Sequence, residues 1–348
     1  MPIIVSLNDR MIPMNKKDNC FAFLKLIIAL SVVYQHARLF GLNLPDIKVI
    51  NWIDKVPLFF FISAYTIMMS LTNRKQSWKE YGFRRFLRIY PELWLSVLFD
   101  VIVLLAQFPY LVKQLQFHLW IFCQSTIFQF WTPDILRFYG NGTPNGSLWT
   151  IFITVQFYVL IYLTYEKIEK LNWKQDIAVL VLCVFGNSFI SFFDERINTI
   201  IFHLMLQTIV PYLYMFYFGI IFYKYSDKLI DLCKKYFWPI VLLFIASSIW
   251  NRYINFIPHT YTTGTVLHVL MCCILFFAIA YKFNNIKLKK DYSYGIYIYH
   301  MIILNLFVHN SLLDNSYGSL CAIYLITFII AVISQQLTEK IVRNLKAV

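Results

Sequence analysis

The sequence predicts an all-α protein that crosses a membrane about ten times, and three observations support this prediction. Hydrophobic residues make up 59% of the 348 residues, and the mean hydropathy is +0.60. Only 14% of the residues are charged, whereas a soluble domain has about 25%. Apolar stretches recur along the whole chain with no polar block between them. We therefore expect one membrane domain over residues 1–348, with a short N-terminal segment 1–19 and a C-terminal tail 339–348.

Ten stretches are long enough to cross a bilayer, whose apolar core needs about 20 residues of helix. Their approximate limits are 20–40, 56–72, 92–112, 148–165, 175–193, 199–223, 237–253, 264–281, 293–311 and 318–338. A further apolar segment, 117–131, is shorter and contains Gln124, Ser125 and Gln129. We expect this segment to be a re-entrant or interfacial piece rather than an eleventh span.

The distribution of Lys and Arg predicts the orientation. Between the expected spans, 24 of the 31 basic residues fall on one side of the membrane. The other side holds Arg38, Lys48, Lys55, Lys113, Arg137, Arg196 and Arg252. Because cytosolic loops are enriched in basic residues, both termini are expected in the cytosol of a multi-pass protein of the plasma membrane.

The net charge of +13 and the seven cysteines exclude other classes. The charge follows from this topology and favours contact with anionic lipid. Nucleic-acid binding would need basic residues gathered on one folded face, and here they are spread over six segments, so no nucleic-acid partner is expected. The cysteines lie mostly in apolar stretches and show no CxxC, CxxH or HExxH spacing, so we expect neither a disulfide framework nor a metal site.

Lys25 and His36 are ionisable residues inside the first expected span, where such side chains are costly and are candidates for function. Eleven residues correspond to three helical turns plus about 20°, so both side chains share one face, about 16 Å apart along the axis. The alternative is that Lys25 extends to the interface and that His36 is satisfied by a neighbouring helix.

Two further polar groups lie near span ends. Arg84, Arg85 and Arg88 precede the third span on the cytosolic side, and their guanidinium groups match phosphate oxygens bidentately, although they could equally be a topology anchor. In the ninth span, Ser293, Tyr297 and His300 follow at i, i+4 and i+7, which predicts a polar stripe that faces protein or a water-filled cavity. Hydrogen bonding between helices would also explain this stripe.

Five segments occur in a characteristic order and spacing. They are Lys25 with His36 eleven positions later, VPLFFFISAY at 56–65, Arg85-x-x-Arg88 followed by Tyr90-Pro91, Leu148-Trp149-Thr150 with Gln156-Phe157-Tyr158, and Ser293-Tyr294-x-x-Tyr297-x-x-His300. Together they resemble the acyltransferase-3 family of integral membrane acyltransferases, over residues 21–311. Two positions depart from that family: it usually has Arg at the position of Lys25, and many members have Glu at the position of Thr154. Asp100 in the third span could replace that carboxylate.

The resemblance implies transfer of an acyl group, most often acetyl from acetyl-CoA, to a hydroxyl of a cell-surface carbohydrate. His36 would be the general base or the acyl carrier. Lys25, Arg84, Arg85 and Arg88 would hold the acyl-CoA. The residues expected to line the pore or contact the thioester are Trp149, Tyr158, Ser293, Tyr297 and His300.

The charge balance and the aromatic residues on the outer side bear on the acceptor, and two alternative functions remain. Outer-side charge is nearly balanced, which favours a neutral glycan. Trp120, Phe130, Trp131 and Tyr139 could stack on sugar faces or form an interfacial belt. A transporter or flippase for a lipid-linked glycan or an acyl group is the alternative class, but paired halves with broken helices are not visible in the sequence. A membrane-bound O-acyltransferase of the other polytopic family is a third possibility, but it would lack the Arg85-x-x-Arg88 and SYGIYIYH segments.

Overall fold

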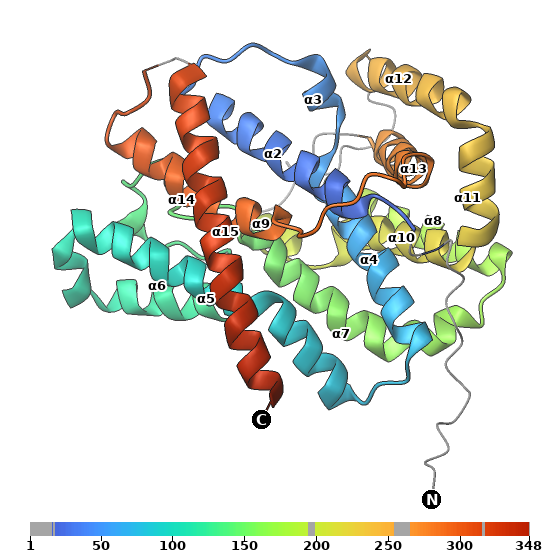
Figure 1. Ribbon diagram of the computed structural model, residues 1–348, viewed down its shortest axis with the longest axis horizontal. Coiled ribbons are helices and arrows are strands. Elements are labelled where there is room, and N and C mark those ends of the chain that lie inside the picture. The colour runs from blue at the N-terminus through green and yellow to red at the C-terminus, as the bar shows by residue number, and fades with distance from the viewer. Residues whose placement is uncertain (1–15, 17, 194–198, 254–264, 315–316, 348) are drawn as a thin grey trace, which may run out of the picture. The chain divides into compact units, whose positions relative to one another are not determined.

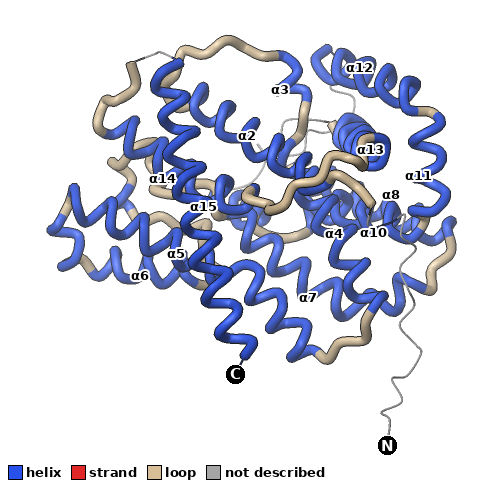
Figure 2. Tube along the Cα trace, viewed as in Figure 1, coloured by secondary structure: helices blue, strands red, loops and turns tan. Residues whose placement is uncertain are grey.

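The computed structural model describes residues 16, 18–193, 199–253, 265–314 and 317–347, and most of them lie in helices that are connected by loops (Figure 1). No strand occurs among these residues (Figure 2). The chain divides into two compact units, which we describe separately. Unit 1 comprises residues 1–24, 56–81 and 156–288, and unit 2 comprises residues 25–55, 82–155 and 289–348.

Nine of the ten expected spans overlap a single α-helix and the sixth, 199–223, is divided between two α-helices, so the count of ten is not confirmed. Within the described residues, six helices are long and apolar enough to cross a membrane: α2 (Phe21–Leu39), α4 (Lys55–Asn73), α5 (Trp78–Gln107), α7 (Trp149–Glu169), α8 (Trp173–Phe192) and α15 (Tyr317–Ala347). The count becomes seven if α9 (Thr199–Leu206) is joined to the segment that contains η3 (Val210–Tyr212) and α10 (Leu213–Lys224), across a 53° bend.

The remaining helices are shorter. α12 (Phe237–Tyr253), α13 (Val266–Lys282) and α14 (Ser293–His309) have 17 residues each, and they coincide with the seventh, eighth and ninth expected spans. α3 (Lys48–Trp52), η1 (Pro109–Lys113), η2 (Asp134–Leu136) and α11 (Ser226–Lys235) are short connecting pieces. In the segment 117–131, α6 (Leu115–Ser125) has 11 residues, which is too few to span a bilayer.

In unit 2, α2 and α5 both run in the same direction as α14. Contacts of α2 with the α14 segment advance from Lys25–Asp291 to His36–His300. Contacts of α5 advance likewise, from the bond of Tyr294 Oη to the Ile89 carbonyl to the bond of Asn310 Nδ2 to Gln107 Oε1. α14 thus has partners on two sides, and side chains that are far apart in the sequence meet along it.

The opposite faces of α14 differ in character. At 100° per residue, Ser293, Tyr297 and His300 share one face, whereas Gly295 lies on the opposite face. A Cβ atom at Gly295 would lie 2.7 Å from Glu92 Oε1 of α5 and 2.9 Å from Cβ of Ala331 in α15. The close approach of these two helices therefore requires glycine at this position.

A glycine-rich loop, residues 140–147, is fastened to α14. Asn305, fully buried, donates from Nδ2 to the carbonyls of Thr143 (2.9 Å) and Pro144 (2.8 Å) and accepts from the backbone N–H of Asn141 (3.0 Å). Gly140 has φ +56°, and a Cβ there would lie 2.3 Å from Asn305 Oδ1. This single side chain satisfies three backbone groups, which explains how a polar loop can be buried here.

In unit 1, a buried ion pair joins the end of α7 to α8 and α10. Lys224 Nζ lies 2.6 Å from Asp176 Oδ2, and the two side chains are 9% and 1% exposed. The hydroxyls of Tyr217 and Tyr225 each donate to Asp176 at 2.7 Å. Lys224 also donates to the carbonyl of Ile168 (2.7 Å), one of the carbonyls that the end of α7 leaves without a helical partner.

The bend between α9 and α10 depends on side chains from two other helices of unit 1. Gln156 of α7 donates to the Gln207 carbonyl (2.8 Å) and accepts from the backbone N–H of Ile209 (3.1 Å). Asn187 of α8 donates to the Pro211 carbonyl at 2.9 Å. Backbone groups freed by a helix break must be satisfied inside a membrane, and these two amide side chains do so.

Candidate active site

The centre of the candidate site is a pair of histidines in unit 2. Nδ1 of His36 on α2 lies 2.8 Å from Nε2 of His300 on α14, and the two ring planes are inclined by only 20°. His300 is fully buried, and its Nδ1 lies 2.7 Å from the backbone carbonyl of Tyr297. His36 is half-buried, and its ring centroid lies 5.8 Å from that of Phe40, in the turn that follows α2. Two predicted site residues, 264 positions apart in the sequence, are therefore in direct contact.

A second ionic group lies three turns earlier on α2. Lys25 forms an ion pair with Asp291, the side chains being 21% and 20% exposed. Asp291 also accepts from the backbone N–H of Ser293 (3.1 Å) and from its hydroxyl (2.5 Å). The carboxylate thereby caps the start of α14 and binds it to α2.

The charges around Asp291 control its ionisation. Burial by itself raises the pKa of Asp291, but the ion pair with Lys25, the hydrogen bonds from Lys25 and Ser293, and the nearby charge of Arg88 outweigh burial and lower this pKa below its usual value. A lowered folded-state pKa stabilises the fold above the usual pKa of the carboxyl, and this stabilisation is lost as the pH falls through the lowered value. The Lys25–Asp291 pair is consequently intact at neutral and mildly acidic pH.

The other predicted site residues lie in different places. Tyr297, on the face of α14 that carries His300, accepts a hydrogen bond from Thr150 Oγ1 (3.2 Å), and the half-buried Trp149 precedes Thr150 at the start of α7. Arg84 and Arg85 on α5 are half-buried and Arg88 is exposed. Tyr158 belongs to unit 1, where its backbone carbonyl accepts from the hydroxyl of Tyr81 (3.1 Å).

Three neighbours of the site were not singled out from the sequence. Asp291 lies two residues before the start of the SYGIYIYH segment, and a carboxylate close to a motif that starts a span is a signal that could have indicated it. Thr150 lies inside the recognised Leu148-Trp149-Thr150 motif. Asn145, which donates to the carbonyl of Ile298 (2.8 Å), lies in a loop whose Asn, Gly and Pro content is unusual for so apolar a chain.

Asp100 does not take part in the histidine pair. None of the hydrogen bonds of His36 and His300 among the described residues involves it, and its buried Oδ1 has no hydrogen-bond partner there. The face of α14 that packs against α5 is opposite the face that carries His300, which separates the two groups. Thr154, the other position considered, donates to the carbonyl of Thr150 one turn earlier (2.8 Å).

Two of the aromatic residues proposed to stack on sugars cannot do so. Trp120 and Tyr139 are 1% and 0% exposed, in a hydrophobic cluster with Leu104, Leu111 and Phe117. That expectation is wrong for these two residues because their size and apolar rings are used for packing within unit 2. Phe130 and Trp131 are half-buried.

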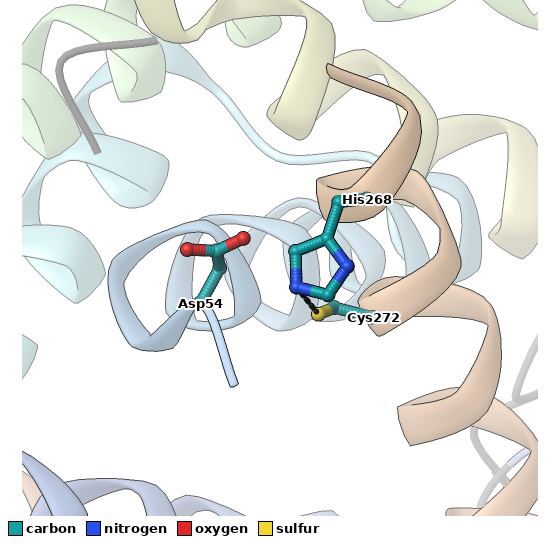
Figure 3. Close-up of side chains that lie close together, drawn as sticks. All are labelled: Asp54, His268 and Cys272. Atoms are coloured by element: carbon teal, nitrogen blue, oxygen red, sulfur yellow. Dashed lines mark hydrogen bonds between the residues drawn. The ribbon is translucent and has the colours of Figure 1, made fainter. Parts of the chain in front are cut away.

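A second histidine contact occurs in unit 1. Nε2 of His268 lies 3.6 Å from Sγ of Cys272, one turn later on α13 (Figure 3). Its Nδ1 lies 3.2 Å from Oγ of Ser247 on α12. Asp54, also labelled in Figure 3, belongs to unit 2. The contact connects α12 with α13, and we assign it no part in the chemistry of the His36–His300 pair.

Apolar helices of membrane-spanning length indicate a multi-pass membrane protein, and the contact between His36 and His300 is the centre of its candidate site. The family model described as an acyltransferase domain matches residues 23–335, and the chain belongs to this acyltransferase-3 family. It is accordingly a membrane acyltransferase. It is also similar to Nodulation protein 10 of Rhizobium leguminosarum bv. viciae, with 24% identity over 309 residues that cover 82% of this chain and 83% of the relative. The search of solved structures gave no significant match.

Proposed function

We propose that this acyltransferase transfers an acyl group, most simply acetyl, from cytosolic acyl-CoA to a hydroxyl of a cell-surface or lipid-linked glycan in the plasma membrane. The observation that carries the proposal is the position of His36. This half-buried residue lies on the same face of α2 as Lys25, and its ring contacts His300 of α14. A positioned imidazole is the usual group for removing a proton from a hydroxyl at neutral pH. Membership of the acyltransferase family supports the reaction class.

The reaction balances with His36 as the general base. The imidazole takes the proton of the acceptor hydroxyl. At the same time the hydroxyl oxygen attacks the thioester carbonyl and forms the new C–O bond. The C–S bond then breaks, and the thiolate of CoA receives the proton from His36. The products are the O-acyl glycan and free CoA, and His36 is returned to its neutral state. Thr150 and Tyr297, joined by a hydrogen bond, are the hydroxyls we assign to contact the reacting carbonyl.

The phosphates of the donor are assigned to the arginines at the start of α5. Arg88 is exposed, and Arg84 precedes it by one helical turn, so two guanidinium forks can face one anion. Lys25 is already paired with Asp291, so its charge is partly compensated before any donor binds. We therefore assign most of the phosphate affinity to Arg84, Arg85 and Arg88, with Lys25 completing the site.

The function is tested with purified protein in lipid vesicles. Acetyl-CoA and surface polysaccharide from cells that lack the gene are added, CoA thiol release is measured, and O-acetyl signals on the polysaccharide are recorded by NMR. We expect both to appear together. A transporter or flippase would leave acetyl-CoA intact, and this result would exclude the proposed reaction.

The role of Lys25 can be separated from its ion pair. We expect Lys25→Arg to keep near-normal activity and Lys25→Gln to raise the KM for acetyl-CoA, because Gln supplies no positive charge to the donor. Lys25→Gln also leaves Asp291 without its partner, so the double variant Lys25→Gln with Asp291→Asn is the control. If the double variant restores the KM, Lys25 acts through its ion pair and not on the donor.

The sidedness of the site gives another test. In a background without the seven native cysteines, Arg85→Cys is expected to react with impermeant thiol reagents only from the cytosol, and acetyl-CoA should protect it. Asn51→Cys, on the exposed helix α3, should react only from outside. A cytosolic Asn51 would contradict the proposed orientation, and labelling of Arg85→Cys that acetyl-CoA does not reduce would exclude the phosphate site.

A further inference from the structure

The ring of His36, the ring of His300 and the backbone carbonyl of Tyr297 form a chain of hydrogen-bonding groups. The carbonyl at one end of this chain determines which nitrogen of His36 carries the proton. Nδ1 of His300 faces the carbonyl of Tyr297 at 2.7 Å. A carbonyl oxygen only accepts hydrogen bonds, so Nδ1 of His300 must carry a proton. In a neutral imidazole the other nitrogen is then an acceptor.

This acceptor is Nε2 of His300, and it faces Nδ1 of His36 at 2.8 Å. Two acceptors at this distance would repel, so Nδ1 of His36 must be the donor. Nε2 of His36 is then left with its lone pair, and it makes no hydrogen bond among the described residues. The Tyr297 carbonyl is thus the fixed end of a chain that exposes one particular nitrogen of His36.

We infer that His300 is a positioning residue that holds His36 as the Nδ1–H tautomer, so that Nε2 is the atom that receives the proton of the acceptor hydroxyl. The inference rests on the proposed function for its catalytic meaning. The contact of His36 with His300 also orients the ring of His36 on α2. His300 itself is fully buried, and we assign it an action through His36 alone.

The same contact stabilises the charged intermediate. When Nε2 of His36 takes a proton, the ring becomes an imidazolium whose Nδ1–H donates to His300 Nε2 in a charge-assisted hydrogen bond, stronger than the neutral one. A partner carboxylate commonly has this role for a catalytic histidine. Here a neutral imidazole has it, because the hydrogen bond to the Tyr297 carbonyl makes His300 an acceptor.

The tautomer is measured by ¹⁵N NMR of the full-length protein in lipid bilayers with labelled histidine. The seven histidines are resolved by comparison with His36→Gln and His300→Gln. We expect a protonated Nδ1 and an unprotonated Nε2 for His36 in the wild type. In His300→Leu, we expect the signal to move toward the tautomer protonated at Nε2. A wild-type His36 protonated at Nε2 would overturn the inference.

Activity gives the second measurement. We expect His300→Leu to lower kcat by about tenfold and to leave the KM for acetyl-CoA unchanged. This loss of kcat is smaller than the loss of about 10²–10⁴-fold expected when a general base is removed outright. His300→Gln should recover most of kcat, because its side-chain carbonyl can accept from Nδ1 of His36. His309→Leu, on the opposite face of α14, is the matched control and should leave both the tautomer and kcat unchanged.

The outcomes separate the inference from the proposed function. If His300→Leu changes the tautomer of His36 but not kcat, the positioning role is wrong. If His300→Gln is as inactive as His300→Leu, a hydrogen-bond acceptor for Nδ1 of His36 is not what supports kcat, and the inference is also wrong. If the wild type transfers no acyl group from any acyl-CoA, the proposed function is wrong, and so is the catalytic role inferred for His300. The NMR spectrum still determines the tautomer of His36 in that case.

Discussion

Replacing His36 with alanine is expected to lower acyl transfer by about 10²–10⁴-fold, the usual contribution of a general base. His36 is half-buried on α2, and alanine has the highest helix propensity, so we expect the helix and membrane insertion to be retained. The rate of CoA release with a fixed acceptor is the measurement, after normalising to folded protein in the membrane.

The matched control for His36→Ala is Gln35→Ala, which removes a polar side chain from the neighbouring position of the same helix, 100° around its axis. We expect this control to retain activity within a factor of a few. Equal losses in both variants would mean that α2 is sensitive to any truncation in this turn. Near-normal activity of His36→Ala would remove His36 from the mechanism.

Hydropathy alone predicts where the helices lie. The expected spans 20–40 and 56–72 agree with α2 and α4 to within about two residues, because each helix presents a continuous apolar stretch bounded by charged or polar residues. α5 differs because its first turns, from Trp78, are rich in Arg and Lys and lie before the apolar window that a hydropathy scan detects.

The break within the sixth expected span illustrates what hydropathy does not reveal. Residues 199–223 are mostly apolar, with Gln207, Thr208 and Pro211 near the middle, so the scan gives one span, whereas the chain bends between α9 and α10. The bend depends on the amide side chains of Gln156 and Asn187, which come from other helices and satisfy the freed backbone groups. Such long-range compensation has no local signal in the sequence.

The site was predicted in its components but not in its pairing. Spacing along one helix placed Lys25 and His36 on a common face, and a second pattern placed Ser293, Tyr297 and His300 on another. Which residue of one helix meets which residue of the other depends on their relative direction and register. The parallel course of α2 and α14 brings His36 to His300 and Lys25 to Asp291, and this information is not contained in either pattern.

Replacing Asp176 with alanine is expected to destabilise unit 1 by about 3–5 kcal/mol, because it leaves the ammonium group of Lys224 buried without its counter-charge. The hydroxyls of Tyr217 and Tyr225 would lose their acceptor at the same time. The measurement is unfolding of the purified protein in detergent. Asp227→Ala is the matched control, since the Asp227 side chain is 64% exposed in its ion pair with Lys16 and should change stability by no more than about 1 kcal/mol.

The double variant Asp176→Leu with Lys224→Met should be markedly more stable than Asp176→Ala, because an apolar pair leaves no buried charge. A double variant as unstable as Asp176→Ala would show that the hydrogen bonds to the tyrosines and to the end of α7, and not the uncompensated charge, determine the stability of this region.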